Sequence, residues 1–148
     1  MNRIILSSLV VLISLTIVSC KKDSSDKCYL SNTSITNNGG AYFKVTKVTK
    51  SGSDITSTYL STCQLGSNIE LYKDYTANYD EIFSTCSGSG SGNWSLNITQ
   101  RTVSLNITTP ASNPILIKDA TVISWDCKSL VLSQQNGGNT YELTLTMQ

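Results

Sequence analysis

Apolar and polar residues alternate with a period of two along most of the chain after residue 40. In residues 93–99, tryptophan, leucine and isoleucine occupy every second position, and asparagine, serine and threonine lie between them. Residues 102–107 and 140–147 repeat this alternation. A period of two places one face of a strand against a core and the other in water, as in an antiparallel sheet. The pattern therefore predicts an all-β fold.

The spacing of these segments predicts a closed barrel. A meander of antiparallel strands with short turns closes naturally into an eight-stranded up-and-down barrel, which has no exposed sheet edge. A two-sheet β-sandwich is the alternative, but its Greek-key crossings need longer connections than most of those here. Outward faces rich in threonine, asparagine and serine, on strands this short, exclude a barrel that contacts lipid. The expected strands are residues 41–49, 69–73, 76–84, 93–99, 102–107, 114–125, 129–135 and 140–147.

The segments between the strands carry recognisable turn signals. Residues 136–139, Asn-Gly-Gly-Asn, tolerate positive φ angles and predict a tight hairpin. Residues 87–92 alternate serine and glycine, which indicates a mobile loop. Residues 54–62 predict a short helical lid, with Asp54 as its cap and Tyr59 pointing inward.

A different pattern occupies the N-terminus. Arg3 precedes an apolar run over residues 4–18, and Ser19 follows this run. A basic start, a short apolar core and a small residue before the break are features of a secretory signal, and the run is too short to span a bilayer comfortably. The sequence Ile-Val-Ser-Cys, which ends at Cys20, resembles the lipobox of bacterial lipoproteins. This resemblance implies cleavage after residue 19, acylation of Cys20 and attachment to a membrane on the exported side.

The stretch after the lipobox is expected to be a tether. Serine, asparagine, aspartate, threonine and glycine dominate residues 20–40, and only Tyr29, Leu30 and Ile35 are large and apolar. A segment of this composition cannot bury enough apolar surface to order itself. The sequence therefore predicts a signal peptide at 1–19, a lipid anchor with a disordered linker at 20–40, and a barrel domain at 41–148.

Charge and composition exclude several kinds of function. Once Arg3 is removed with the signal, acidic and basic residues are equal in number, so the mature chain has no electrostatic reason to bind nucleic acid. The chain contains no histidine, which removes the commonest general base and the Ser-His and Cys-His nucleophile pairs. It also lacks a C-x-x-C pair for zinc. We expect no catalytic residues, no metal site and no cofactor, and hence a protein that is not an enzyme.

Four cysteines remain if Cys20 carries lipid: Cys28, Cys63, Cys86 and Cys127. An even number in an exported chain favours disulfides, and buried thiols are the alternative. Of the three connectivities, the favoured one joins Cys63 to Cys86, because these two flank an expected hairpin. Cys28 and Cys127 then pair by remainder.

Several motifs in the barrel region occur in an order known from one family. Residues 42–45 are Tyr-Phe-Lys-Val, residues 92–96 are Gly-Asn-Trp-Ser-Leu, and residues 141–144 are Tyr-Glu-Leu-Thr, with the Cys63 and Cys86 pair between the first two. From Gly40 onward the chain resembles the lipocalin-like domain of small lipoproteins from Gram-negative bacteria. The resemblance implies a small barrel on an exported, lipid-anchored protein, and it implies no agreed activity.

Aromatic residues are the best candidates for contact with a ligand. Rings that line a barrel can hold a small hydrophobic or planar molecule, but they can equally fill the core, and packing is the favoured interpretation. We expect a lipid-anchored lipoprotein of the cell envelope, in the outer membrane. One interpretation of its barrel is that it binds a small hydrophobic ligand. The alternative is a non-catalytic structural or protein-interaction lipoprotein with a filled barrel and unknown partners. The candidate ligand-binding residues are Phe43, Phe83, Trp94, Trp125 and Tyr141.

Overall fold

The alternating segments form strands of a single sheet in the computed structural model, which describes residues 28–80, 88–108 and 115–148. Two short helices and one 3-10 turn accompany the strands: α1 (Asn32–Ile35), α2 (Thr56–Tyr59) and η1 (Gln64–Gly66). The strands are β1 (Gly40–Lys50), β2 (Ser53–Asp54), β3 (Asn68–Tyr72), β4 (Thr76–Asp80), β5 (Ser89–Asn97), β6 (Thr102–Thr108), β7 (Ile115–Trp125), β8 (Ser129–Asn136) and β9 (Asn139–Met147).

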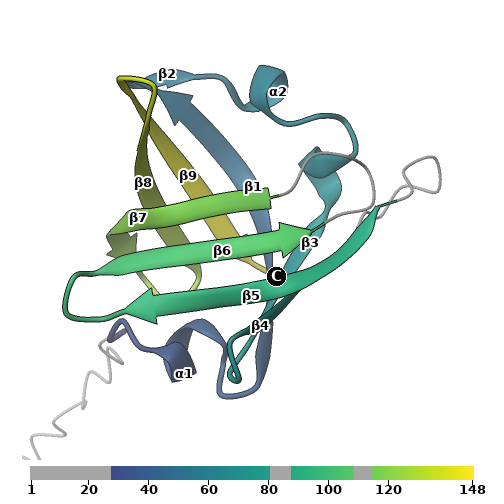
Figure 1. Ribbon diagram of the computed structural model, residues 1–148, viewed down its shortest axis with the longest axis vertical. Coiled ribbons are helices and arrows are strands. Elements are labelled where there is room, and N and C mark those ends of the chain that lie inside the picture. Colours follow the sequence, from purple (N-terminus) through teal and green to yellow (C-terminus); the bar gives the residue numbers. More distant parts are fainter. Residues whose placement is uncertain (1–27, 81–87, 109–114) are drawn as a thin grey trace, which may run out of the picture.

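The sheet closes on itself because β1 pairs at both of its edges. Phe43 lies opposite Ile69 of β3 on one side and opposite Met147 of β9 on the other. All pairings are antiparallel, and each barrel strand pairs with the next one along the chain while β9 pairs back with β1. The fold is therefore an eight-stranded up-and-down barrel with β2 added at the end of β1 (Figure 1). This confirms the predicted fold class. The sandwich alternative is wrong, because the first and last strands pair and leave no second sheet.

A bulge in β1 changes which of its side chains point into the barrel. The register of β1 against β9 shifts between Val45 and Lys47. An extra residue inverts the alternation beyond it, so Val48 and Lys50 are the inward positions that follow. Val48 is fully buried, whereas Lys50 lies opposite Tyr141 at the end of the strand.

Large apolar side chains from all around the sheet fill the interior. A hollow barrel would leave its lining side chains in contact with water, but Phe43 and Ile107 are 0 % exposed. The inward side chains form one continuous apolar cluster. At these positions the interior is packed rather than open. The barrel members of this cluster are Ala41, Phe43, Ile69, Leu71, Ala77, Tyr79, Trp94, Val103, Leu105, Ile107, Ile117, Ala120, Val122, Trp125, Leu130, Leu132, Leu143 and Leu145.

The serine-glycine run forms strand where a loop was predicted. β5 begins at Ser89, and Gly90 and Gly92 lie opposite Tyr79 and Ile107 on the neighbouring strands. A Cβ atom on Gly92 would collide with the backbone of Asn106. The glycine therefore permits a close approach of two strands. Composition alone indicated flexibility, and the prediction was wrong for residues 89–92.

The prediction of a disordered linker is also wrong for residues 28–39. Ser31 caps α1 in a capping box with Ser34, which satisfies backbone donors that a single helical turn leaves open. Ile35 is fully buried in the cluster of the barrel. Residues 28–39 thus cover one end of the barrel (Figure 1). We call this the strapped end, and it also holds the turns from β3 to β4, β5 to β6 and β7 to β8.

The opposite end of the barrel, which we call the mouth, holds α2 and the turns from β1 to β2 and from β8 to β9. The predicted lid over residues 54–62 is helical only in α2. The Asp54 carboxylate accepts bonds from the backbone N–H and the hydroxyl of Thr56, at 2.9 and 2.6 Å. Half of the surface of Tyr59 is exposed and its ring lies against Tyr141, so it reaches the mouth and does not enter the barrel core.

Candidate functional site

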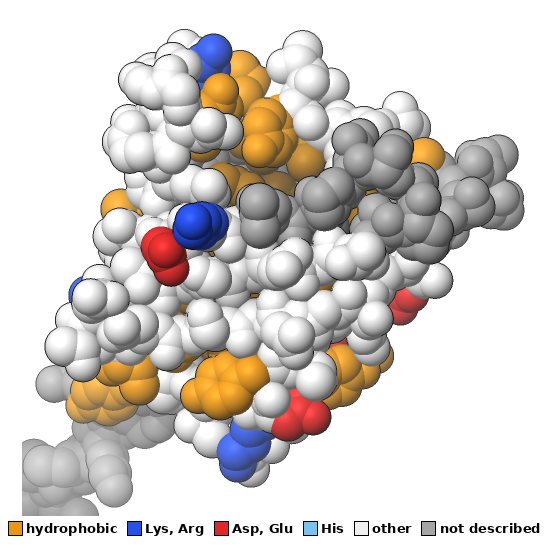
Figure 2. Space-filling model, viewed as in Figure 1, with side chains coloured by type: hydrophobic (Ala, Val, Ile, Leu, Met, Phe, Trp, Pro, Cys, Tyr) orange, Lys and Arg blue, Asp and Glu red, His pale blue; other side chains and the backbone are white. Residues whose placement is uncertain are grey.

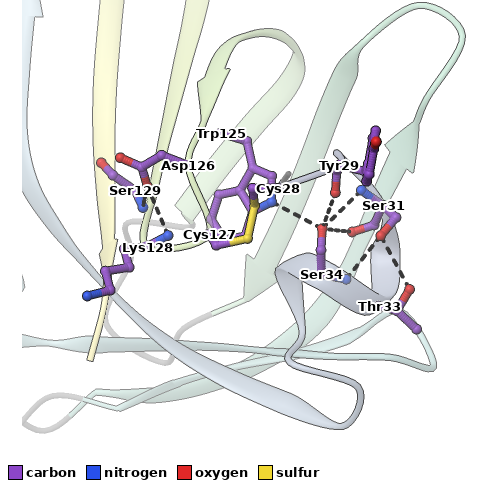
Figure 3. The surroundings of a disulfide bond; sticks show 10 residues. All are labelled: Cys28, Tyr29, Ser31, Thr33, Ser34, Trp125, Asp126, Cys127, Lys128 and Ser129. Carbon is purple, nitrogen blue, oxygen red and sulfur yellow. Dashed lines mark hydrogen bonds between the residues drawn. A yellow bond between two sulfur atoms is a disulfide. The ribbon is translucent and has the colours of Figure 1, made fainter. Parts of the chain in front are cut away.

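A disulfide ties the covering segment to the barrel at the strapped end. Cys28 is bonded to Cys127, across 99 positions of sequence and a Cα–Cα distance of 5.5 Å (Figure 3). This is the pair that remained by elimination in the sequence. The other predicted pair, Cys63 with Cys86, stays a prediction because Cys86 lies outside the described residues. Residues 1–27 also lie outside them, so cleavage and lipidation at Cys20 stay predictions.

Ser34 connects α1 to the barrel wall beside this disulfide (Figure 3). The Trp125 indole N–H donates to the Ser34 hydroxyl oxygen at 3.1 Å, and that hydroxyl donates to the carbonyl of Tyr29 at 2.6 Å. The backbone N–H of Ser31 also donates to the Ser34 oxygen, at 3.2 Å. The Ser34 hydroxyl and the Trp125 indole N–H are therefore both bonded within the protein.

Three of the five candidate aromatic residues belong to the packed core. The rings of Phe43 and Trp125 lie 6.3 Å apart. The Trp94 indole N–H donates to the carbonyl of Tyr72 at 2.8 Å, and its ring contacts Tyr75 at 5.4 Å. Their polar atoms have partners and their rings have neighbours, so these side chains serve packing. A fourth candidate, Phe83, lies outside the described residues.

The fifth candidate, Tyr141, lies at the mouth and lines a pocket. Its ring contacts Tyr59 of α2 at 5.8 Å, with a tilt of 44° between the planes. The pocket has a volume of about 50 Å³, and Figure 2 shows hydrophobic side chains gathered in a hollow at this end. The structure therefore separates Tyr141 from the other aromatic candidates. The pocket is lined by Tyr59, Ile117, Gln134, Asn136, Tyr141 and Leu143.

Polar side chains occupy inward positions around this pocket. The inward residues of β8 are Leu130 and Leu132 in its first half and Gln134 and Asn136 in its second. Gln134 lies directly opposite Tyr141. Among the described residues, neither amide side chain has a hydrogen-bond partner. The sequence analysis placed Asn136 correctly in the tight hairpin over residues 136–139, where it is exposed beside Gly137 and Gly138. It missed Gln134, and the loss of apolar character at an alternate position of this strand was the signal that could have found it.

One cation lies beside the pocket. The Lys50 ammonium is 5.9 Å from the centre of the Tyr141 ring, close to the limit at which a cation is attracted to an aromatic face. The described residues that line the pocket include no carboxylate, and the Lys50 ammonium disfavours a second cationic group beside Tyr141.

A second polar cluster lies on the outer face of β1 and β3. A hydrogen bond to Glu70 raises the pKa of Tyr42, and a hydrogen bond to the same carboxylate raises the pKa of Tyr72. Asn78 also donates to the Tyr72 hydroxyl at 3.4 Å. Tyr42 is exposed on the outside of the barrel, while its neighbour Phe43 points inward. The two phenols are therefore held protonated on an open surface and not in a cleft.

Exposed aspartates stabilise turns at both ends of the barrel. The pKa of Asp126 is lowered by bonds from the backbone N–H groups of Lys128 and Ser129. The pKa of Asp54 is lowered by bonds from the hydroxyl and the backbone of Thr56. Both shifts follow from hydrogen bonds to the charged form, so they mark local turn geometry.

Nothing in the described residues groups three or more potential metal ligands. Within the same ranges, no helix has the length and apolar character to cross a membrane. Comparisons with protein-family models, curated proteins and solved structures found no match to this chain. Function must therefore be argued from the geometry of the two ends.

Proposed function

We propose that this chain is a lipocalin-like, lipid-anchored lipoprotein of the cell envelope, attached to the outer membrane through acylated Cys20. Its packed barrel is a rigid, non-catalytic body that carries the mouth away from the membrane. The lipobox-like sequence before Cys20 motivates the anchor. The disulfide at the strapped end is the structural observation that carries the proposal.

The Cys28–Cys127 disulfide supports export. Disulfides persist in oxidising compartments outside the cytoplasm and are rare where thiols are kept reduced. This one joins two residues that are 99 positions apart, so it connects distant parts of the fold and does not merely close a local turn. It is therefore consistent with a protein that has crossed the inner membrane.

The position of Cys28 sets the orientation of an anchored barrel. Cys20 precedes it by eight positions, and a chain of that length spans at most about 29 Å. The tether would thus leave from the strapped end and hold this end within about one barrel length of the bilayer. The mouth would point away, toward soluble partners.

The packed interior favours the filled-barrel alternative over a hydrophobic ligand inside the barrel. Phe43, Trp94 and Trp125 are buried against other side chains, and pockets for small molecules usually enclose about 300–1,000 Å³. The pocket at the mouth has about 50 Å³. A rigid body that presents its surface or its mouth to a partner fits these facts better than an enclosed carrier.

Mass spectrometry of the protein purified from its own membrane tests the anchor. We expect a mature chain that starts at residue 20 and whose mass exceeds that of the polypeptide by the mass of acyl and glyceryl groups. The Cys20→Ser variant should lose this added mass and leave the membrane fraction. An unmodified mass for the natural chain would refute the anchor.

A further inference from the structure

We propose that the mouth pocket binds the ring of a neutral pyranose sugar, such as the terminal residue of an envelope glycan. The first support is the unusual polarity of its wall. Gln134 is partly buried at a position where alternation would put a core residue, and a polar residue there weakens packing unless it has a function. It lines the pocket together with Asn136, which is exposed at the end of β8, and with Tyr59 and Tyr141.

The polar groups of the pocket can form further hydrogen bonds. In the described part of the chain, the side-chain amides of Gln134 and Asn136 and the hydroxyls of Tyr59 and Tyr141 have no hydrogen-bond partner. Two amides and two phenols can both donate and accept, which matches the hydroxyl groups at the edge of a sugar. A purely apolar ligand would cover these groups without replacing their bonds to water, and this costs binding energy.

The apolar part of the pocket matches the C–H groups on the faces of a sugar ring. Leu143 and Ile117 form a buried floor, and the two tyrosine rings are tilted by 44° at 5.8 Å. A pyranose presents C–H groups on its faces and hydroxyls around its rim, so it can contact rings and floor with one surface. Its hydroxyls then reach the amides. Lys50 beside Tyr141 makes a cationic ligand a poor alternative.

The size of the pocket defines how much of the ligand is held. A volume of about 50 Å³ holds part of one ring and leaves the rest in solvent, as in a shallow site. We therefore expect weak binding of monosaccharides, in the millimolar range, and selectivity for one ring at a chain end.

Saturation-transfer NMR on the full mature protein tests the site. The probes are glucose, N-acetylglucosamine and cyclohexanol, which has a similar ring without the multiple hydroxyls. We expect transfer to at least one sugar and none to cyclohexanol. Tyr141→Ala should weaken sugar binding about tenfold and Gln134→Leu about fivefold. Neither outcome depends on whether Cys20 carries lipid.

Matched variants keep the test specific to the pocket. Gln135→Leu changes the neighbouring amide, which donates to Thr140 outside the pocket at 2.7 Å, and Tyr42→Ala removes an exposed tyrosine on the outer face. Both should bind sugar like the natural protein, with unchanged circular dichroism. The proposal is overturned if no sugar gives transfer, if cyclohexanol competes with the sugar, or if the control variants weaken binding as much as Gln134→Leu.

Discussion

The two ends of the barrel differ in how the apolar core is closed off from solvent. At the strapped end, Ile35 seals the core, and the buried polar atoms of Thr36 and Trp125 bond to Asn32 and Ser34. At the mouth, inward positions carry Gln134 and other polar groups whose side chains have no partner among the described residues. One end is completed by the chain itself. The other carries the pocket that we propose binds a sugar, which is why we place stability at the first and recognition at the second.

Removal of the disulfide should produce the largest difference between the ends. Cys28→Ser together with Cys127→Ser frees a loop of 99 positions, and the lost constraint is worth about 4 kcal/mol of unfolding free energy. Urea denaturation measures it. Hydrogen exchange should rise first in residues 28–39 and β7 rather than in the β8–β9 turn. Equal exchange at both ends would contradict the assignment of stability to the strapped end.

Ile35→Ala should be the next largest effect. This side chain is 0 % exposed, and truncation of a buried isoleucine costs about 3 kcal/mol in unfolding free energy. Ile98→Ala is the matched control at the same end, because Ile98 is 57 % exposed; its cost should stay within about 0.5 kcal/mol. If both variants melt alike, α1 does not seal the barrel.

Ser34→Ala should destabilise the protein by about 2 kcal/mol, since it removes a capping partner and leaves a buried indole N–H unpaired. The measurement is again denaturant unfolding, followed by tryptophan fluorescence. Thr33→Ala is the control, because Thr33 is exposed and the one bond of its hydroxyl among the described residues is with the Ser31 hydroxyl, at 3.3 Å. If Thr33→Ala lowers the unfolding free energy as much as Ser34→Ala does, the hydrogen bonds of Ser34 do not account for its effect on stability.

At the mouth, the expected change in unfolding free energy has the opposite sign. Gln134→Leu extends the apolar series of Leu130 and Leu132 and should raise stability by about 1 kcal/mol, while it weakens sugar binding. Gln135→Leu, on the outer face, should leave stability within about 0.5 kcal/mol of the natural value. If Gln134→Leu destabilises the barrel, the amide has a structural partner and the mouth is not held open for a ligand.

The smallest expected effect is one of pH, and it should not distinguish the ends. The pKa values of Asp126 and Asp54 are both lowered by hydrogen bonds to the carboxylate. Each contribution is therefore complete above the ordinary aspartate pKa of about 3.9 and is lost as pH falls through the folded value. Carboxyl NMR titration should give both midpoints below that of a model peptide. A midpoint at or above the ordinary value would contradict the turn geometry.

Sequence alternation was sufficient to predict the barrel and insufficient to predict its ends. The period of two in β6 and β9 is a property of many residues together, so single exceptions did not obscure it. The covering segment depends on one buried isoleucine, Ile35, and on a disulfide to a residue 99 positions away, neither of which composition reveals. The glycines of β5 were misread because their role is a close approach of strands, which only the tertiary structure shows.

The candidate site was predicted only in part for a related reason. Tyr141 was selected with four other aromatic residues, and sequence could not separate a ring in the core from a ring at the mouth. The pocket also needs Tyr59, whose position depends on α2. Gln134 and Asn136 can be recognised as lining residues only once the register of β8 shows that these positions lie at the pocket.

Paramagnetic broadening of the lipidated protein in nanodiscs with gadolinium-chelating headgroups tests the central claim most directly, because it compares the two ends in one sample. The account predicts broadened amide signals for Ile98 and Lys128, in turns of the strapped end, and sharp signals for Gly137 and Gly138 in the β8–β9 turn. Broadening of the glycine signals equal to or greater than that of Ile98 and Lys128 would contradict it.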